Sequence, residues 1–175
     1  MTDLPAAPTI RTATVEDARA IAEIHVASWR WAYRGEMSEA FLKDLDVDAR
    51  EIRWRGTIQE AGTTVLVGGV DDIDRVGFSC VGPSRDDDAR EGDGELHAIY
   101  LLQEATGVGL GRALLEGANS ILRDSGYRRA TAWVLESNVR ARTFYERARW
   151  TWDGSRSEHR FDCANLPIVR YVFDL

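Results

Sequence analysis

Cysteine is scarce in this sequence, where only Cys80 and Cys163 occur, and the two do not form a C-x-x-C pair. Two cysteines are too few for the disulfide framework of a small secreted protein, and zinc sites need several closely spaced ligands. The sequence therefore predicts no metal site and no redox chemistry. It favours two buried free thiols.

Long apolar runs are missing as well, because no stretch approaches the roughly 20 residues of a membrane-spanning helix. The opening residues, MTDLPAAPTI, have neither a basic segment nor an apolar core of signal-peptide length. We therefore expect no association with a membrane and a cytoplasmic location.

Clusters of lysine and arginine are also absent from the sequence. The net charge of -7 and the lack of any basic run disfavour nucleic acid as a partner, because its phosphates require clustered basic side chains. An acidic chain of this kind would instead attract a cationic small molecule.

The residues that are present have the composition of a globular protein, with 44% hydrophobic and 29% charged side chains among 175 residues. A chain of this length can bury most of its apolar surface in one core. We expect a flexible N-terminus over residues 1–8 and a single domain over residues 9–175.

Apolar periodicity and turn residues divide the chain into alternating strands and helices. Strands are predicted at residues 9–13, 63–70, 75–82, 95–102 and 128–136, with a closing antiparallel pair after residue 150. Helices are predicted at residues 14–35, 111–125 and 137–150, and one or two more at residues 38–62. The order β-α-α-β-β-β-α-β-α-β-β predicts an α/β fold with a mixed sheet, helices on both faces, and a helix at 111–125 that joins two parallel strands.

Two surface features have simple interpretations. The acidic segment PSRDDDAREGDG, residues 83–94, is typical of a solvated turn, with a binding role as the alternative. Six tryptophans and a C-terminal strand that could be exposed leave room for a homodimer.

The segment ATGVGLGR, residues 105–112, has glycine at every second position between a strand and a helix. This arrangement forms an anion site, since unpaired N–H groups point outward and the helix dipole favours negative charge. A P-loop is excluded because Gly111 is followed by Arg112 and Ala113, and a dinucleotide fingerprint is excluded because Arg112 or Leu114 stands where glycine is needed. The segment predicts phosphate binding of another kind, and a glycine turn without a ligand is the alternative.

Two blocks, ELHAIYLLQEATGVGLGRALL and GYRRATAWVLESNVRARTFYERARW, resemble the GNAT superfamily of N-acetyltransferases in spacing and in residue type. The resemblance covers residues 9–175 and implies a mixed, mostly antiparallel sheet of about seven strands flanked by about four helices. It also implies acetyl-CoA as co-substrate, no metal, and direct transfer of the acetyl group to a primary amine of a small molecule or peptide. A non-catalytic acetyl-CoA sensor and an enzyme acting on protein N-termini or lysines are the alternatives.

The resemblance assigns the donor site to three segments of the chain. The pyrophosphate of coenzyme A would lie on the glycine segment, where Thr106 replaces the family's usual Gln or Arg. Strand residues would lie along the pantetheine arm, and Asn138 would contact the cofactor. The implied cofactor-binding residues are Ile99, Tyr100, Leu101, Thr106, Gly107, Val108, Gly109, Leu110, Gly111, Arg112, Asn138 and Tyr145.

Acetyl transfer to an amine requires a base for the ammonium proton and an acid for the departing thiolate. Glu95 stands where several members of the family keep a catalytic glutamate, and we expect it to act as the base through water; a solvent-facing glutamate is the alternative. His97 is a second candidate for the base, or else a hydrogen-bonded core histidine. Strict alternation would place Glu95, His97, Ile99 and Leu101 on one face of their strand.

Tyr145 is the candidate acid, because a phenol with an ordinary pKa of about 10 holds its proton at neutral pH and can pass it to a basic thiolate. It follows Asn138 by seven residues, which is two turns along one helix face. The alternatives are an aromatic core residue for Tyr145 and a helix cap for Asn138.

A stripe of His25, Trp29 and Tyr33, four residues apart on the first helix, would form an aromatic wall of the acceptor pocket in the resembled family. Core packing is the alternative for each of the three. The acceptor site is therefore predicted from His25, Trp29, Tyr33 and His97.

Overall fold

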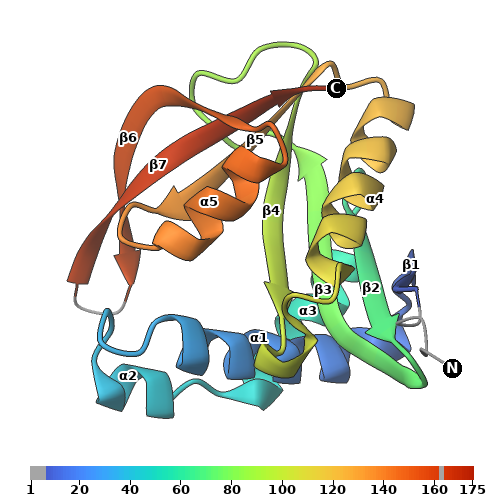
Figure 1. Ribbon diagram of the computed structural model, residues 1–175, viewed down its shortest axis with the longest axis vertical. Helices are drawn as coiled ribbons and strands as arrows, with labels where there is room; N and C mark the ends of the chain where they lie inside the picture. The colour runs from blue at the N-terminus through green and yellow to red at the C-terminus, as the bar shows by residue number, and fades with distance from the viewer. Residues whose placement is uncertain (1–6, 162–163) are drawn as a thin grey trace, which may run out of the picture.

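The computed structural model describes residues 7–161 and 164–175. The elements follow the order β1 (Thr9–Thr12), α1 (Ala18–Ala32), α2 (Glu39–Lys43), α3 (Val47–Ile58), β2 (Thr64–Val70), β3 (Ile73–Pro83), β4 (Asp93–Leu101), α4 (Leu110–Asp124), β5 (Arg129–Leu135), α5 (Val139–Arg147), β6 (Thr151–Phe161) and β7 (Ala164–Asp174) (Figure 1). Most of the predicted flexible N-terminus, residues 1–6, and Cys163 lie outside the described residues. Cys80 is a buried free thiol. Within the described ranges, no helix is both long enough and apolar enough to cross a membrane.

The seven strands form one sheet in the order β1-β2-β3-β4-β5-β7-β6. Among these strands β4 and β5 run parallel, and α4 joins them; the other pairs of neighbours are antiparallel. This confirms the predicted mixed sheet. The C-terminal strand β7 lies inside the sheet between β5 and β6, and β6 forms that edge.

The described residues contain five α-helices, because residues 38–62, where one or two helices were predicted, divide into α2 and α3. Asp46 causes the division. Its side chain accepts hydrogen bonds from the N–H groups of Asp48 (2.8 Å) and Ala49 (3.3 Å), which starts a new helix.

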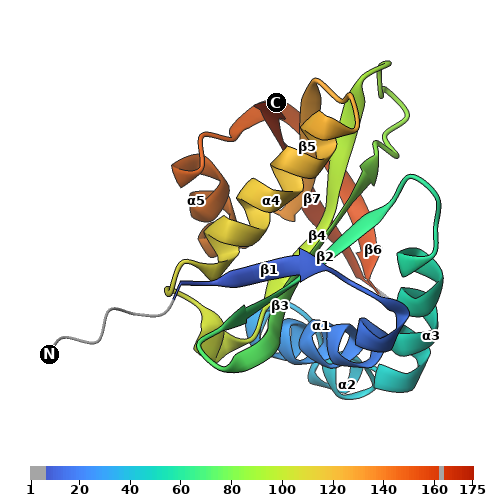
Figure 2. The same cartoon turned by 90° about the vertical axis from the view of Figure 1, so that its right-hand side faces the viewer.

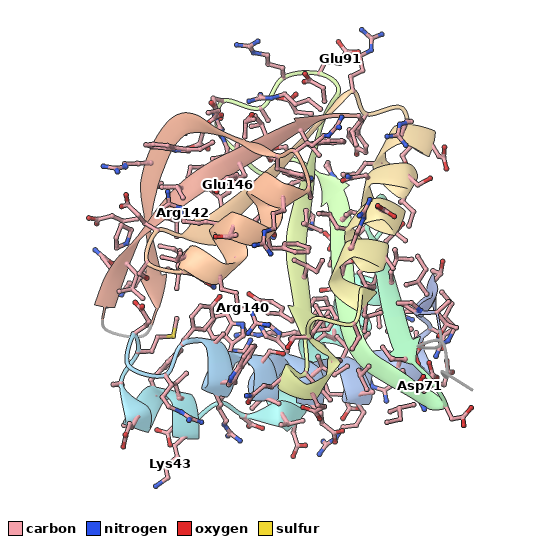
Figure 3. All side chains as sticks on the ribbon, viewed as in Figure 1. Lys43, Asp71, Glu91, Arg140, Arg142 and Glu146 are labelled. Atoms are coloured by element: carbon pink, nitrogen blue, oxygen red, sulfur yellow. The ribbon has the colours of Figure 1, made fainter. Side chains whose placement is uncertain are left out.

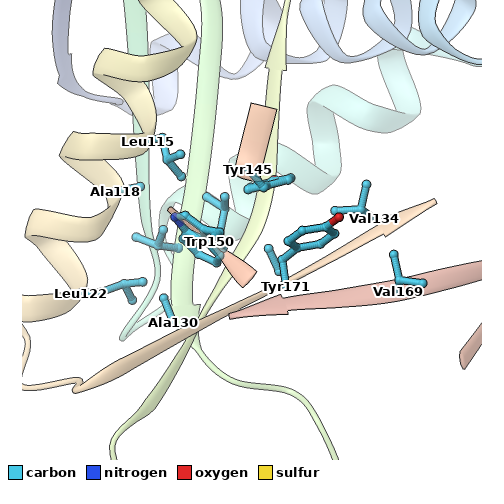
Figure 4. Packing of buried hydrophobic residues seen from close by; sticks show 12 residues of the cluster. Leu115, Ala118, Leu122, Ala130, Val134, Tyr145, Trp150, Val169 and Tyr171 are labelled. Atoms are coloured by element: carbon cyan, nitrogen blue, oxygen red, sulfur yellow. The ribbon is translucent and has the colours of Figure 1, made fainter. Parts of the chain in front are cut away.

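Helices cover both faces of the sheet (Figures 1 and 2). On one side, called the α1 face, Ile21 of α1 and Trp54 of α3 pack with Phe78 and Cys80 of β3. On the other, called the α4 face, the α4 residues Leu115, Ala118 and Leu122 pack with the residues shown in Figure 4, among them Tyr145 of α5 and Tyr171 of β7. Because successive side chains of a strand point to opposite faces of the sheet, the strands contribute residues to two separate hydrophobic cores, one on each face.

Strand β4 stands at the centre of the sheet, where the sheet opens. Its pairing with β5 is limited to residues Asp93 to Glu95 opposite Arg129 to Thr131. Beyond Glu95 the two strands diverge (Figure 1), so one edge of β4 has none of the described strands beside it.

A β-bulge in β4 corrects the predicted distribution of side chains. Cys80 of β3 lies opposite Ala98 while Val81 lies opposite Leu96, which leaves His97 as an extra residue. The prediction that Glu95, His97, Ile99 and Leu101 share one face is therefore wrong. Ile99 and Leu101 pack on the α4 face, whereas His97 approaches Cys80 on the α1 face and Glu95 lies beside it.

Candidate active site

A cleft of about 1390 Å³ opens where β4 and β5 separate. Its walls come from α1, α3, β4, the glycine segment, β5, α5 and the β6–β7 hairpin. All the predicted site residues line it except Val108, whose side chain is largely exposed, and Leu110, whose side chain is buried in the core beside Leu114. For Leu110, therefore, only the backbone can serve a ligand.

The open edge of β4 offers backbone hydrogen-bonding groups to the cleft. The N–H of Leu102 donates to the carbonyl of Val76 on β3 (2.8 Å). Because antiparallel residues alternate, the N–H and carbonyl groups of Ile99 and Leu101 then point away from β3 and into the opening. The Ser28 hydroxyl on α1 donates to the Leu101 carbonyl (2.7 Å). Three backbone groups are left for a strand-like ligand.

The glycine segment ends the cleft at the start of α4. Gly107 and Gly109 have φ values of +81° and +90°, a region that side chains rarely adopt. The first helical hydrogen bond runs from Ala113 N–H to the Gly109 carbonyl (3.0 Å), so the N–H groups of Leu110, Gly111 and Arg112 precede the hydrogen-bonded ladder. A Cβ atom on Gly107 would meet nothing within 4 Å. These residues fit a phosphate group.

Gly111 lies where α4 meets α5, since a Cβ atom there would be in van der Waals contact with the Phe144 ring, at 3.4 Å. Arg112 is exposed beside the cleft, and its Nε donates to Glu116 (2.7 Å). An incoming phosphate would compete with this helix-surface ion pair, which is weak in water.

The Thr106 hydroxyl donates to the Gln103 carbonyl (2.6 Å) within the short 3-10 turn before the glycines. Replacing Thr106 with Gln gives up this local bond and adds the longer amide donor that the family usually has. We expect equal or modestly tighter coenzyme A binding, measured by calorimetry. A large loss of affinity would contradict the backbone as the main phosphate ligand.

Glu95 is 5% exposed and is held on the α1 face by one neighbour. The backbone N–H of Arg85 donates to Glu95 Oε2 (2.8 Å), and Arg85 Nη2 donates to Glu95 Oε1 (2.8 Å). The predicted alternative, a glutamate that faces solvent, is wrong. The carboxylate is oriented by Arg85 at the wall of the cleft.

His97 lies next to Glu95, with 3.9 Å between His97 Nε2 and Glu95 Oε2. The same nitrogen lies 3.1 Å from the Pro83 carbonyl oxygen, which requires a proton on Nε2. Burial and the neighbouring Arg85 guanidinium lower the pKa of His97, so the ring is neutral at neutral pH. His97 therefore has the hydrogen bond of a core histidine and also lines the cleft.

Tyr145 belongs to the core and to the cleft at the same time. Its ring stacks on Tyr171, with 5.7 Å between the ring centroids, and contacts Trp150 (Figure 4), yet the residue lines the cleft. Burial raises the pKa of Tyr145, so the phenol is protonated at neutral pH. Asn138 caps α5 by accepting from the Ala141 N–H (3.0 Å), as the alternative for this residue predicted, and also lines the cleft.

The three residues predicted to form the aromatic wall lie together on the α1 face and line the cleft. His25 stacks on Tyr100 of β4 with 5.0 Å between ring centroids, and Trp29 meets Tyr33 edge to face at 5.2 Å. The indole N–H of Trp54 on α3, a residue that the sequence pattern did not single out, donates to His25 Nδ1 (3.2 Å). Burial and Arg50 lower the pKa of His25 to about 3, so the wall carries no charge from this ring.

Other cleft residues were missed because their partners are distant in the sequence. Arg140, at the start of α5, lies over the Trp31 ring of α1 at 4.3 Å and between the two helices in Figure 3. The acidic turn at residues 83–94 is not simply solvated, since Asp86 and Asp88 bind Arg170 of β7. In the part of the chain that the structure describes, no three His, Cys, Asp or Glu side chains are grouped to hold a metal ion.

The sequence pattern of the acetyltransferase (GNAT) family matches residues 18–149, which span the whole cleft except the β6–β7 hairpin. The chain belongs to the acetyltransferase (GNAT) family. This GNAT protein is similar to the uncharacterized N-acetyltransferase YuaI of Bacillus subtilis (strain 168), with 37% identity over 131 residues, 74% of this chain and 73% of the relative. An uncharacterized N-acetyltransferase of Archaeoglobus fulgidus is 31% identical over 137 residues, 78% of this chain and 88% of the relative.

The fold of this GNAT protein also resembles solved structures. The PaiA N-acetyltransferase of Thermoplasma acidophilum, solved in complex with coenzyme A, superposes with a TM-score of 0.73 at 20% identity, covering 97% of this chain and 99% of the other. The protein is thus an N-acetyltransferase of the GNAT type, and acetyl-CoA is the acetyl donor of its family.

Proposed function

We propose that the protein transfers the acetyl group of acetyl-CoA to a primary amine of a small molecule or peptide, by direct attack within a ternary complex. The observation that carries this proposal is the meeting, in one cleft, of the open edge of β4, the free N–H groups at the start of α4, Glu95 and Tyr145.

The donor site consists mainly of backbone. The Ile99 and Leu101 groups on the open edge of β4 suit the amides of a pantetheine arm, because such an arm can pair with them like an added strand. The N–H groups of Leu110, Gly111 and Arg112 suit the diphosphate, which the positive end of the helix dipole also favours. Asn138 and Thr106 lie beside this path.

Tyr145 is the proton donor in this proposal. As the amine nitrogen forms its bond to the acetyl carbon, the carbon–sulfur bond breaks and a basic thiolate leaves. A phenol whose pKa is raised by burial carries its proton at neutral pH and can give it to that sulfur. Tyr145 is fixed by Tyr171 and Trp150, so the ring keeps its orientation while the proton moves.

Glu95 is the proton acceptor. An amine substrate reaches the protein as an ammonium ion, which must lose a proton before its nitrogen can attack the thioester. The Glu95 carboxylate is oriented by Arg85, and it takes this proton through a water molecule. The aromatic wall of His25, Trp29 and Tyr33 lies on the same face and suits a cationic amine on its way in.

Replacing Glu95 with Gln is expected to depress kcat/KM about 100-fold near neutral pH and progressively less as pH rises. The reason is that free amine accumulates toward an ammonium pKa of about 10, so the base is needed less. The measurement is a pH–rate profile with an accepted amine. Glu91→Gln, on an exposed part of the loop before β4, is the control and should follow the wild-type profile. A uniform loss at every pH would argue against proton transfer to Glu95.

The proposed function is tested by incubating the protein with acetyl-CoA and a panel of polyamines, amino acids, aminoglycosides and peptides, and by following the release of free thiol. Amine-dependent release supports transfer. A protein that binds acetyl-CoA but releases no thiol with any amine would instead be a sensor of acetyl-CoA. Release with peptides alone would identify the acceptor as a protein terminus or lysine.

A further inference from the structure

Arg170 of β7 lines the same cleft as Glu95 and makes an unusually complete set of ion pairs. The side chain is 8% exposed. Its guanidinium donates to Asp88 (2.6 and 2.8 Å), to Asp86 (3.1 Å) and to Asp153 (2.9 Å), and also to the Ser155 hydroxyl (3.0 Å). A buried guanidinium with this many charge-assisted bonds is rigidly placed.

These contacts connect two parts of the protein that the sheet itself barely joins. Asp86 and Asp88 belong to the loop between β3 and β4, while Arg170, Asp153 and Ser155 belong to β7 and β6. Among the described strands, the pairing between these halves is the short β4–β5 ladder that ends at Glu95. Trp133 of β5 strengthens the link, because its indole N–H donates to Asp86 (2.6 Å) and its ring lies 5.5 Å from the Arg170 guanidinium.

The same loop also orients Glu95. Arg85, the residue before Asp86, donates both its backbone N–H and its guanidinium to the Glu95 carboxylate. Any displacement of Asp86 would therefore move the Arg85 backbone, and with it the group that holds Glu95. Arg85, Asp86, Asp88, Glu95, Trp133 and Arg170 all line the cleft.

We propose that Arg170 is a positioning residue: it fastens the β3–β4 loop across the split in the sheet and so fixes Glu95 and the width of the cleft on the acceptor side. This inference rests on the proposed function for its kinetic consequence, but not for its structural one. Arg170 does not touch the reacting atoms and acts through Asp86 and Arg85. The main donor contacts proposed above, the open edge of β4 and the N–H groups at the start of α4, involve neither Arg170 nor its aspartate partners.

The experiment compares Arg170→Gln with two further variants. Asp88→Asn removes the charge that accepts the two shortest bonds of Arg170, from a side chain that is 66% exposed, so it should fold even if Arg170→Gln does not. Arg129→Gln is the matched control, because Arg129 also binds Asp153 (3.2 Å) and Asp93 (3.4 Å) in the same sheet but does not line the cleft.

Arg170→Gln is expected to lower kcat/KM for the amine by about 10- to 100-fold, as expected of a small misplacement of catalytic groups. The KM for acetyl-CoA should stay within about twofold, because the donor contacts are untouched. Asp88→Asn should show the same selective loss at smaller size, and Arg129→Gln should behave as wild type. A rise in the KM for acetyl-CoA as large as the loss of kcat/KM for the amine, or a normal kcat/KM for the amine in both Arg170→Gln and Asp88→Asn, would overturn the proposal.

Hydrogen exchange provides a readout that is independent of activity. Amides of residues 84–92 should exchange at least about tenfold faster in Arg170→Gln and Asp88→Asn but not in Arg129→Gln, since the loop loses its attachment to β7. Unchanged exchange in both Arg170→Gln and Asp88→Asn would contradict the proposal that Arg170 attaches this loop to β7. If the wild-type protein showed no acetyl transfer, the proposed function would fail, while this exchange result would still decide the role of Arg170.

Discussion

Tyr145→Phe is expected to lower kcat by about 100-fold or more while leaving coenzyme A affinity near the wild-type value. The substitution removes one oxygen and keeps the ring that stacks on Tyr171 and contacts Trp150. The departing thiolate then lacks its proton donor, but the packing of the core is preserved. Steady-state kinetics with an accepted amine, together with calorimetry for coenzyme A, gives both quantities.

Tyr171→Phe is the matched control for this prediction. Tyr171 stacks on Tyr145, its hydroxyl donates to Glu146 (2.6 Å), and it does not line the cleft. Loss of that bond should cost about 1 kcal/mol of stability and leave kcat unchanged. If Tyr145→Phe also lost only stability and kept its kcat, Tyr145 would be a core residue and not the proton donor to the thiolate.

Gly109→Val is expected to weaken coenzyme A binding by about 100-fold, because blocking two backbone N–H groups removes roughly 1.5 kcal/mol for each charge-assisted bond. Gly109 precedes α4 with φ at +90°, and a β-branched side chain there would cover the N–H groups that follow. Calorimetric titration with coenzyme A measures the loss.

The backbone strain of this substitution needs its own control, since valine at such a φ value lowers folding stability by roughly 1–3 kcal/mol at any position. Gly126 has the same φ of +90° at the far end of α4, a Cβ atom there would meet nothing within 4 Å, and the residue has no part in the cleft. Gly126→Val should therefore match Gly109→Val in melting temperature and bind coenzyme A normally. Unchanged affinity for coenzyme A in a folded Gly109→Val protein would show that its phosphates do not bind to this segment.

The local chemistry of the chain was enough to predict most of the fold. Helices such as α4 repeat their apolar residues with a single clear period, and the order of strands and helices then limits the possible sheets to a few. The division of residues 38–62 was left open because a cap such as Asp46 is a single residue within a polar stretch. The place of β7 inside the sheet depends on pairing between distant strands, which no local pattern reports.

The site was predicted less completely, and for physical reasons. The bulge at His97 depends on how β3 and β4 pair, so alternation alone wrongly grouped Ile99 and Leu101 with Glu95 on one face. The role of the aspartates at 86 and 88 depends on Arg170, which is more than 80 positions away in the sequence. Glycines and caps, by contrast, act on their own neighbours, and Gly109 and Asn138 stand at the helix starts that the sequence predicts.

The most direct test of direct transfer is a single-turnover measurement with acetyl-CoA that carries carbon-14 in its acetyl group. The protein is mixed with a slight deficit of labelled donor, with and without an accepted amine, and the protein is then separated from small molecules. Direct transfer predicts that the label moves only when amine is present, that it is recovered in the N-acetyl product in the same amount as the free thiol, and that the protein stays unlabelled. Label bound to the protein before amine is added, or thiol released without a labelled amine, would contradict it.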